Sequence, residues 1–497
     1  MELEKLSMDY LAQAPIALAM AKHELPFALA FSSFLLFVTV VSSSSFSPVD
    51  HYLINCGSQG SAVDLDHRRF DGDSSSNSPL ISPSHSVSLA DSDPRPGSSP
   101  IYHTGRVFNR PSKYAFSIRD PGAHLVRLHF QVLNTGLNYS NAQFYVLANE
   151  YVLLNSSSIE AIWNSAVIRD YAIRVDSDKL VIAFVPSEKS KFAFVNGIEV
   201  LSAPKDLIAD SAQDLNSHKN ERIDGLSKNA LETVYRVTMG GPKVTPFNDT
   251  LWRTWLPDDE FLVKPGGSSK AYYGGHIQYQ AGGASREVGP DNMYNTARII
   301  KSSSDSIPKA NISWAFPVEE GYKYLVRTHF CDISSLSSGL LYFNFYVNGF
   351  LAYKNMDLTE ITNGMLASPF YADFVVDGGE GNSGILTVSV GPSDMSVARA
   401  VDAILNGVEI MKMNNSMGSF GGEVCAGYVL RRWGRTRNGD GFALPLLAGA
   451  VFLLLIGSVA VKRSFRFGDS FVWSRLPLEV PVGVSKLSSI QVSSNKV

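Results

Sequence analysis

Apolar and polar residues alternate along several short segments of this chain. In residues 125–130 (LVRLHF) every second position from 126 on is apolar, and Arg127 and His129 stand between those positions. This two-residue period predicts a strand with one buried face. Residues 345–353 (FYVNGFLAY) are two β-prone runs on either side of an Asn-Gly pair. The pair indicates a hairpin, because both central residues of the tightest turns need a positive φ.

No long segment carries a helical period, and turn-forming residues are frequent, with 39 Gly and 24 Pro among 497 residues. Many short strands separated by such turns favour an antiparallel β-sandwich, so the predicted fold class is all-β. Residues 71–100 are rich in Ser, Pro and Asp. This composition predicts an exposed loop.

The strand pattern occurs twice along the chain. Residues 125–130 recur as residues 325–330 (LVRTHF). Four further pairs of similar segments keep the same order: 102–106 and 294–298, 144–146 and 345–347, 180–187 and 386–393, and 196–200 and 406–410. The spacing within the pairs drifts, as expected after a duplication followed by loop insertions. We therefore expect two tandem domains, at residues 46–215 and 231–415, joined by a polar segment.

The N-terminal segment is typical of secreted proteins. Residues 26–41 are almost uninterrupted apolar residues, and four serines follow them. An apolar run of this length before small residues predicts a signal peptide, with a buried core helix as the competing interpretation. The first residues are acidic, whereas a start at Met20 would give the basic lead that signal peptides have. We assign residues 1–45 to a signal-peptide region, with Met20 as an alternative start.

A second apolar segment, residues 442–461, has 20 residues and no charge. At a rise of about 1.5 Å per residue it would span about 30 Å, the thickness of a bilayer's hydrocarbon core. Basic residues flank it on both sides, so the signal peptide sets its orientation. The sequence predicts a single-pass type I plasma-membrane protein with an extracellular N-terminal ectodomain. Residues 416–441 would be a juxtamembrane linker and residues 462–497 a short cytoplasmic tail.

Five Asn-x-Ser/Thr triplets lie between the two apolar segments, where the glycosylation machinery of the secretory pathway could reach them. The expected glycosylation sites are Asn138, Asn155, Asn248, Asn311 and Asn414. Such triplets arise by chance, but their confinement to one side of the predicted membrane helix agrees with the predicted orientation.

Composition excludes several classes of protein. Lys and Arg number 43, Asp and Glu number 47, and no basic block is present, so the chain offers no electrostatic footprint for nucleic acid. Three cysteines exclude a disulfide-dense scaffold and a multi-cysteine zinc module. At least one of Cys56, Cys331 and Cys425 is unpaired or joined to another chain, and buried free thiols are the alternative. The acidic run 258–260 lacks the spacing of a calcium loop and predicts a solvated loop, so we expect no metal site there. We also expect no cofactor.

Several segments in register resemble a known family. Residues 52–57 (YLINCG), the two LVR-x-HF segments, residues 251–258 (LWRTWLPD) and residues 406–411 (NGVEIM) are similar to the tandem malectin-like ectodomain of plant receptor kinases of the FERONIA and THESEUS group. The resemblance extends to Met413 and then through the second apolar segment. It implies two jelly-roll domains like the animal lectin malectin. It also implies a cell-surface role in sensing wall polysaccharide or rapid alkalinization factor peptides, the latter with a GPI-anchored co-receptor.

The chain departs from that family at its C-terminal end. Family members carry a cytoplasmic Ser/Thr kinase, whereas only 36 residues follow Val461. These residues contain none of the glycine-loop, Val-Ala-Ile-Lys, His-Arg-Asp or Asp-Phe-Gly motifs that a kinase needs. We therefore expect no enzyme activity, in a kinase-less receptor-like protein or a truncated form. A decoy or structural partner of full-length receptor kinases is an alternative, as is a wall glycosidase with two carboxylates about 5 or 6.5–9.5 Å apart.

Binding of a sugar usually needs aromatic faces that stack on the ring and polar groups that meet its hydroxyls. The candidate ligand-binding residues are Tyr102, Arg106, Tyr114, Tyr294, Arg298 and Trp314. A fold-determining role is the alternative that we favour, because residues shared by both halves more often specify a fold than a ligand site.

The repeated Arg-x-His pairs, at residues 127 and 129 and at residues 327 and 329, invite a catalytic interpretation. Residues two apart on a strand face the same side, so each pair could present one polar face. No motif ties a carboxylate or a nucleophile to either pair. We therefore expect structural hydrogen bonding and no catalytic residue.

Overall fold

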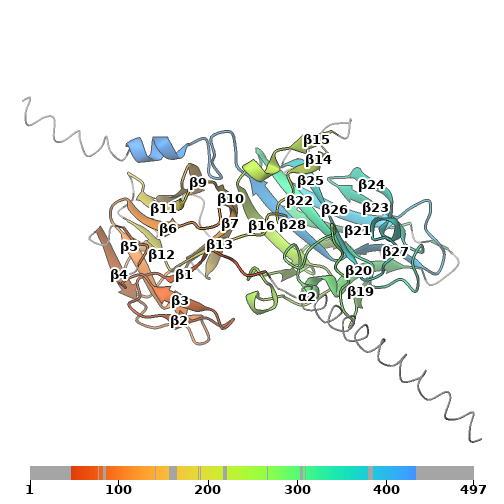
Figure 1. The fold of residues 1–497 in the computed structure, drawn as a ribbon, viewed down its shortest axis with the longest axis horizontal. Coiled ribbons are helices and arrows are strands. Elements are labelled where there is room, and N and C mark those ends of the chain that lie inside the picture. The colour runs from red at the N-terminus through yellow and green to blue at the C-terminus, as the bar shows by residue number, and fades with distance from the viewer. Residues whose placement is uncertain are drawn as a thin grey trace, which may run out of the picture. The chain divides into compact units, whose positions relative to one another are not determined.

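The computed structural model describes residues 46–432, apart from 76–77, 82–84, 140–141, 156–164, 189, 191, 216–220, 266, 303–305, 308 and 379–383. These residues form a mostly β structure, as predicted (Figure 1). We refer to residues 46–215 as the first half and to residues 231–415 as the second half.

The longest sheet runs through both halves. Its strands, in spatial order, are β15 (Arg222–Asp224), β14 (Ser211–Asp214), β25 (Pro369–Gly378), β22 (Tyr322–Cys331), β28 (Gly407–Met413), β16 (Leu231–Thr238), β10 (Val167–Val175), β7 (Gly122–Phe130), β13 (Gly197–Ser202), β1 (His51–Asn55), β3 (Arg69–Gly72) and β2 (Ala62–Val63), with β17 (Leu256–Pro257) beside β16. Strand β16 is the join, because it pairs antiparallel with β10 of the first half and with β28 of the second. Figure 1 shows β16 between β10 and β28.

Each half has further sheets that pack against the long one. In the first half these are β6 (Ser112–Ser117), β11 (Lys179–Pro186), β8 (Phe144–Ala148) and β9 (Tyr151–Asn155), and separately β12 (Ala193–Val195), β5 (Thr104–Phe108) and β4 (Ser86–Ala90). A hydrophobic cluster joins the two layers, with Leu128 of β7 and Phe184 of β11 fully buried in it. Strand β4 lies within the segment 71–100, which the sequence predicted as a loop, and pairs with β5.

The second half is built in the same way. Its further sheets are β18 (Leu262–Lys264), β21 (Ile312–Pro317), β26 (Ile385–Pro392), β23 (Tyr342–Val347) and β24 (Phe350–Asp357), and separately β19 (Ser269–Tyr272), β20 (Thr296–Lys301) and β27 (Val401–Leu405). A second cluster, which includes Val326 and Phe343, fills the space between layers. The predicted hairpin is confirmed: β23 and β24 are joined by Asn348 and Gly349, with φ of 49° and 78°.

Strand β7 is buried on both faces, so the prediction of one buried face is wrong. Arg127 and His129 are only 4% and 1% exposed. The second face lies against a third hydrophobic cluster to which both halves contribute, including Leu125 of β7 and Leu325 of β22. The alternation of residue types reflects two different buried environments: one is apolar, and in the other buried charged side chains lie beside apolar ones.

The described helices are short. They are the 3₁₀ turns η2 (Pro100–Tyr102), η6 (Leu226–Lys228) and η7 (Pro246–Asn248), the helical turns α2 (Asp291–Tyr294) and α3 (Leu358–Ile361), and a helix that begins at Ala426. Among the residues described above, no helix has the length and apolar character that a membrane crossing requires, since a span takes about 20 apolar residues. The expectation of a single-pass type I plasma-membrane protein is corrected accordingly. The predicted signal-peptide region 1–45, the apolar segment 442–461 and the tail 462–497 lie outside the described residues.

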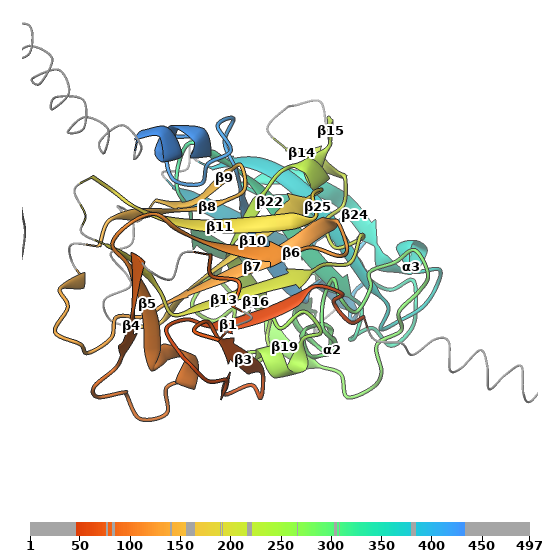
Figure 2. The same cartoon turned by 60° about the vertical axis from the view of Figure 1, so that its left-hand side comes forward.

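After β28 the chain returns to the first half. We call residues 414–421 the strap. The Val152 amide donates to the Gly418 carbonyl at 2.9 Å, and the Phe420 amide donates to the Val152 carbonyl at 3.0 Å. The Phe420 side chain is 3% exposed and belongs to the core of the first half. In Figures 1 and 2 the described C-terminal end, in blue, lies close to β9.

Candidate ligand-binding site

Two of the predicted ligand-binding residues, Arg106 and Tyr114, meet on one buried carboxylate. Arg106 Nε and Nη2 lie 3.0 and 2.5 Å from the carboxylate oxygens of Asp73, and the Tyr114 hydroxyl donates to Asp73 Oδ2 at 2.7 Å. Asp73 is 2% exposed. The expected exposed loop is therefore wrong at this residue, because a buried guanidinium needs a buried partner for its charge.

The second half repeats this arrangement. Arg298 Nε and Trp314 Nε1 donate to Asp258 Oδ2 at 2.8 and 2.9 Å. Asp258 is fully buried, so the prediction of a solvated loop is wrong for it. Burial alone would lower the pKa of Arg298, but the hydrogen bond and charge of Asp258 outweigh burial and raise it.

The predicted tyrosines Tyr102 and Tyr294 bind the repeated histidines. The Tyr102 hydroxyl is 2.9 Å from His129 Nδ1, and His129 Nε2 is 2.8 Å from Glu199 Oε1. In the second half the Tyr294 hydroxyl is 3.0 Å from Nδ1 of the equivalent histidine, whose Nε2 is 3.2 Å from Glu409. Each half therefore holds one buried Tyr–His–Glu chain.

The repeated arginines form buried ion pairs and also reach across the junction of the halves. Arg127 donates to Glu199 at 2.8 Å and to the Leu251 carbonyl, which belongs to the second half, at 2.6 Å. Arg327 donates to both carboxylate oxygens of Asp373 at 2.8 Å and to the Leu207 carbonyl, which belongs to the first half, at 2.6 Å. The structural hydrogen bonding expected for the Arg-x-His pairs is confirmed.

Glu199 is the common partner of Arg68, Arg127 and His129 in the first-half cluster. Burial opposes its ionisation, but Arg127 and Arg68, with help from His129, hold the pKa of Glu199 well below its usual range. Burial also opposes the ionisation of Glu409, but the charge of Arg236 is the largest of several influences that together lower the pKa of Glu409. Both carboxylates are therefore anions that neutralise buried arginines, and neither is poised for proton transfer.

All six residues predicted for ligand binding are at least nine-tenths buried, and the polar atoms of each bond to other residues of the chain. This placement supports the fold-determining alternative, and a ligand contact at these residues stays a prediction. Sequence reasoning missed their acidic partners. Glu199 and Glu409 stand in the repeated Asn-Gly-x-Glu segment, which could have identified them, whereas Asp73 and Asp258 share no flanking motif.

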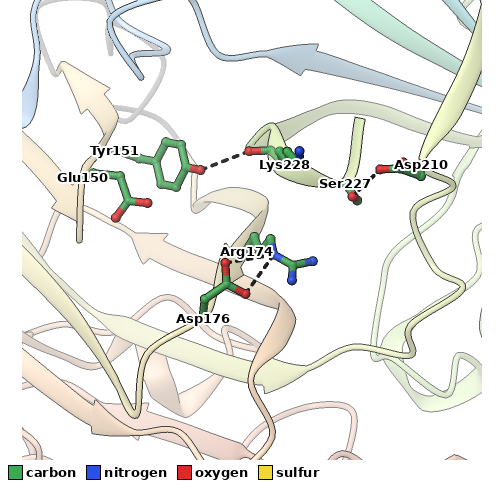
Figure 3. A pocket seen from close by; sticks show the side chains of 7 residues that line it. All are labelled: Glu150, Tyr151, Arg174, Asp176, Asp210, Ser227 and Lys228. Carbon is green, nitrogen blue, oxygen red and sulfur yellow. Dashed lines mark hydrogen bonds and ion pairs between the residues drawn. The ribbon is translucent and has the colours of Figure 1, made fainter. Parts of the chain in front are cut away.

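An accessible site lies elsewhere, in a polar cleft of about 550 Å³ (Figure 3). Its walls come from the turn between β8 and β9, the end of β10, the segment before β14, and η6. The lining residues are Glu150, Tyr151, Arg174, Asp176, Asp210, Ser227 and Lys228. We call it the β9 cleft, because Tyr151 begins that strand. Its volume lies within the range of about 300–1,000 Å³ found for ligand sites.

Charge in the β9 cleft is mixed. Arg174 and Asp176 form an ion pair at 2.8 Å, and the Tyr151 hydroxyl donates to the Lys228 carbonyl at 3.3 Å. No ion pair engages the side chains of Glu150 and Lys228 within the described part of the chain. The cleft can therefore present the carboxylates of Glu150 and Asp210 and the ammonium of Lys228 to a polar ligand with both signs of charge.

In the cleft, hydrogen bonding shifts the pKa of Asp210, and burial shifts the pKa of Tyr151. Ser227 donates to Asp210 at 2.5 Å, which lowers the pKa of that carboxyl. Burial raises the pKa of Tyr151, and the nearby charges of Glu150 and Asp176 add to the effect. At neutral pH Asp210 is thus an acceptor and Tyr151 a neutral hydroxyl.

The predicted glycosylation sites differ in exposure. Asn138 and Asn248 are exposed, and the other three are half-buried. Asn155 donates its amide to the Gly421 carbonyl at 3.4 Å, and Asn414 donates to the Asn415 carbonyl at 2.9 Å. Two of the five amides are thus already engaged by the strap. Glycosylation of these residues stays a prediction.

The cysteines are free thiols in the structure, with Cys56 and Cys331 buried and Cys425 half-buried. Burial raises the pKa of both buried thiols, so the structure favours the buried-thiol alternative over a disulfide at these two residues. Among the described residues, no group of three or more His, Cys, Asp or Glu side chains could hold a metal ion.

Comparison with known proteins gives a consistent result. The family described as "Malectin-like domain" matches residues 54–413. A probable receptor-like protein kinase of Arabidopsis thaliana, At5g24010, is 42% identical over 384 residues, which are 76% of this chain and 46% of that protein. The receptor-like protein kinase THESEUS 1 of the same plant is 38% identical over 388 residues, 78% of this chain and 44% of that protein. The chain thus spans about half the length of these relatives.

Solved structures resemble the fold as well. The extracellular domain of ANXUR2 from Arabidopsis thaliana superposes with a TM-score of 0.67 and 29% identity, covering 75% of this chain and 98% of that one. A crystal structure of the plant peptide RALF23 in complex with FER and LLG2 matches with a TM-score of 0.65 and 31% identity, covering 76% of this chain and 99% of the matched chain.

Proposed function

The chain belongs to the malectin-like family of receptor kinase ectodomains, and we propose that it binds a secreted peptide of the rapid alkalinization factor class together with a GPI-anchored co-receptor. One observation carries this proposal: a matched structure, covered almost completely, is a complex with the peptide RALF23 and with LLG2. Within this proposal, residues 46–215 and 231–415 are two tandem malectin-like domains.

The β9 cleft is the surface that we assign to the peptide. A peptide presents charged side chains and backbone hydrogen-bond donors and acceptors, and the cleft offers Glu150, Lys228 and the Tyr151 hydroxyl to such groups. Wall glycan is a less favoured ligand, because the aromatic residues that suggested it are buried.

We propose binding, not catalysis, as the function of the described part. The β9 cleft does contain three carboxylates, which is the feature that a glycosidase would need. A glycosidase also needs one carboxylic acid with a raised pKa as general acid. Asp210 has a lowered pKa and Asp176 is paired with Arg174, so two of the three carboxylates do not suit that role.

The test is a binding measurement on the full chain by biolayer interferometry. Immobilised chain is exposed to RALF23 alone, to LLG2 alone and to both, and we expect the tightest binding with both. Charge reversal in the cleft, Lys228→Glu or Glu150→Lys, should weaken peptide binding by about tenfold or more, since each reversed charge costs roughly 1.4 kcal/mol or more. Lys354→Glu, at a residue of β24 whose side chain is 62% exposed, is the matched control. Absence of binding under all conditions would refute the function, whereas unchanged binding in both cleft variants would refute only the cleft.

A further inference from the structure

A second groove, of about 770 Å³, lies on the outer face of the five-stranded sheet of the second half. The pairing of residues between neighbouring strands determines which side chains form the floor of this groove. Lys264 of β18 pairs with Ser313 of β21, Ser313 with Ser389 of β26, and Ser389 with Tyr346 of β23. Partners in register across neighbouring strands point to the same face. These four side chains therefore form one row across the outer face, while residues between them, such as Phe345, face the core.

The groove contains a predicted glycosylation site. Asn311, of the triplet Asn-Ile-Ser, precedes β21 and lines the groove. The structure gives its half-buried side-chain amide no hydrogen bond to another described residue. By contrast, the amides of Asn155 and Asn414 are engaged by the strap. The Asn311 amide can therefore be modified without loss of a bond.

A difference between the two repeats makes room for this side chain. In the repeated segments 180–187 and 386–393, Val185 of the first half is replaced by Gly391 in the second. A Cβ on Gly391 would lie 1.8 Å from Asn311 Oδ1, far inside contact distance. Glycine at this position is thus what lets Asn311 lie against β26.

The lining suits a saccharide attached at Asn311. Tyr346 is half-buried and offers an aromatic ring, and its hydroxyl has no hydrogen-bond partner among the described residues. Ser313 and Ser389 bond to each other at 2.8 Å and supply hydroxyl donors and acceptors. An apolar face beside a few placed polar groups is the combination by which proteins hold amphipathic ligands such as sugar rings. None of the described residues that line the groove carries a carboxylate.

We propose that Asn311 carries an N-linked glycan whose first N-acetylglucosamine residues lie in this groove, against Tyr346. The glycan then covers the outer face of this sheet. It would protect the exposed side chains at its edge, such as Val263, which is 59% exposed. This inference is independent of peptide binding.

The test compares glycans on one molecule. The full chain is expressed in plant cells treated with kifunensine, so that glycans remain of the high-mannose type, and occupancy of each triplet is measured by glycopeptide mass spectrometry. Native protein is then digested with endoglycosidase H, and the rate of cleavage is followed at Asn311 and at the exposed Asn248 and Asn138. We expect cleavage at Asn311 to be about tenfold slower, the factor that about 1.4 kcal/mol of groove binding would give. After denaturation the rates should be equal.

Two variants separate the groove from other causes of slow cleavage. Tyr346→Ala should raise the native cleavage rate at Asn311 to that at Asn248 and leave occupancy unchanged. Tyr272→Ala, at a tyrosine that is 77% exposed and outside the groove, should change nothing. An unmodified Asn311 would overturn the proposal, and so would equal native rates at Asn311 and the exposed sites or a Tyr346→Ala variant that still cleaves slowly.

Discussion

The ring of Phe420 lies against the ring of Tyr171, with 5.5 Å between their centroids. Phe420 belongs to the strap that follows the second half, whereas Tyr171 lies on β10 of the first half. A residue near the end of the described chain therefore completes a core that was begun about 250 residues earlier. The strap also pairs with strand β9 of the first half, through Val152. The neighbouring residue of that strand, Tyr151, lines the β9 cleft.

We expect Phe420→Ala to lower the free energy of unfolding by about 3–5 kcal/mol, because it removes a fully buried aromatic ring and leaves a cavity. Urea unfolding followed by tryptophan fluorescence measures the change. Met417→Ala is the control, since Met417 lies on the same strap and is 43% exposed. If both variants are equally stable, the strap does not contribute to the core.

Asp73→Ala should destabilise the protein by about 3–5 kcal/mol. The substitution leaves Arg106 as an unpaired buried charge and removes the acceptor of the Tyr114 hydroxyl. The control is Asp71→Ala, two residues away, where the ion pair with Arg69 is solvent-exposed and is worth about 0–1 kcal/mol. Thermal unfolding measured by calorimetry compares the stability of the two variants. If both lose a similar amount of stability, the buried contacts of Asp73 do not stabilise the fold as expected.

Stability should fall in acid because of Glu199 and Glu409. Their pKa values are lower in the folded protein than the usual 4.5. In acid the unfolded chain therefore binds more protons than the folded one, and stability is lost as pH falls below about 4.5. Unfolding free energies between pH 3 and 7 measure the slope. Glu199→Gln should lower stability at neutral pH and flatten this slope, whereas an unchanged slope would contradict the assignment.

Glu232 should act in the opposite sense. Burial raises its pKa despite the nearby charges of Arg169 and Lys412. The folded protein thus holds this proton at higher pH than the unfolded chain, and its contribution to stability decreases as pH rises from about 4.5 through the folded-state pKa. Glu232→Gln should remove that decrease, as measured by the same titration of unfolding free energy. The control is Glu320→Gln, at an exposed residue.

Arg236→Leu should weaken the junction of the halves. Arg236 donates to Asp170 of the first half at 2.9 Å and to Glu409 of the second at 2.7 Å, so its loss leaves two buried carboxylates underpaired. We expect a loss of about 3–5 kcal/mol and faster hydrogen exchange at the amides of β16. If hydrogen exchange becomes faster only in strands other than β16, Arg236 does not stabilise the junction of the halves.

Part of the candidate site was predictable from the sequence. The repeated segments identified Arg106, Arg298 and the two histidines as important to both halves, and the preference for a fold-determining role agrees with their burial. The β9 cleft was not predictable, because its lining comes from β9, β10 and η6, which are separated along the chain. No local pattern links residues that meet only after folding.

The sequence by itself determined the features that depend on near neighbours: the strand alternation, the Asn348–Gly349 hairpin and the order of the repeated segments. These follow from side-chain periodicity and turn geometry, which act over a few residues. Only the tertiary structure decided which acid neutralises Arg106, which strand joins the halves, and where Phe420 packs. Those outcomes depend on burial, since a charge or a ring acquires its partner when distant segments exclude water together. Asp73 looks like one of many acids in a loop until Arg106 is buried beside it.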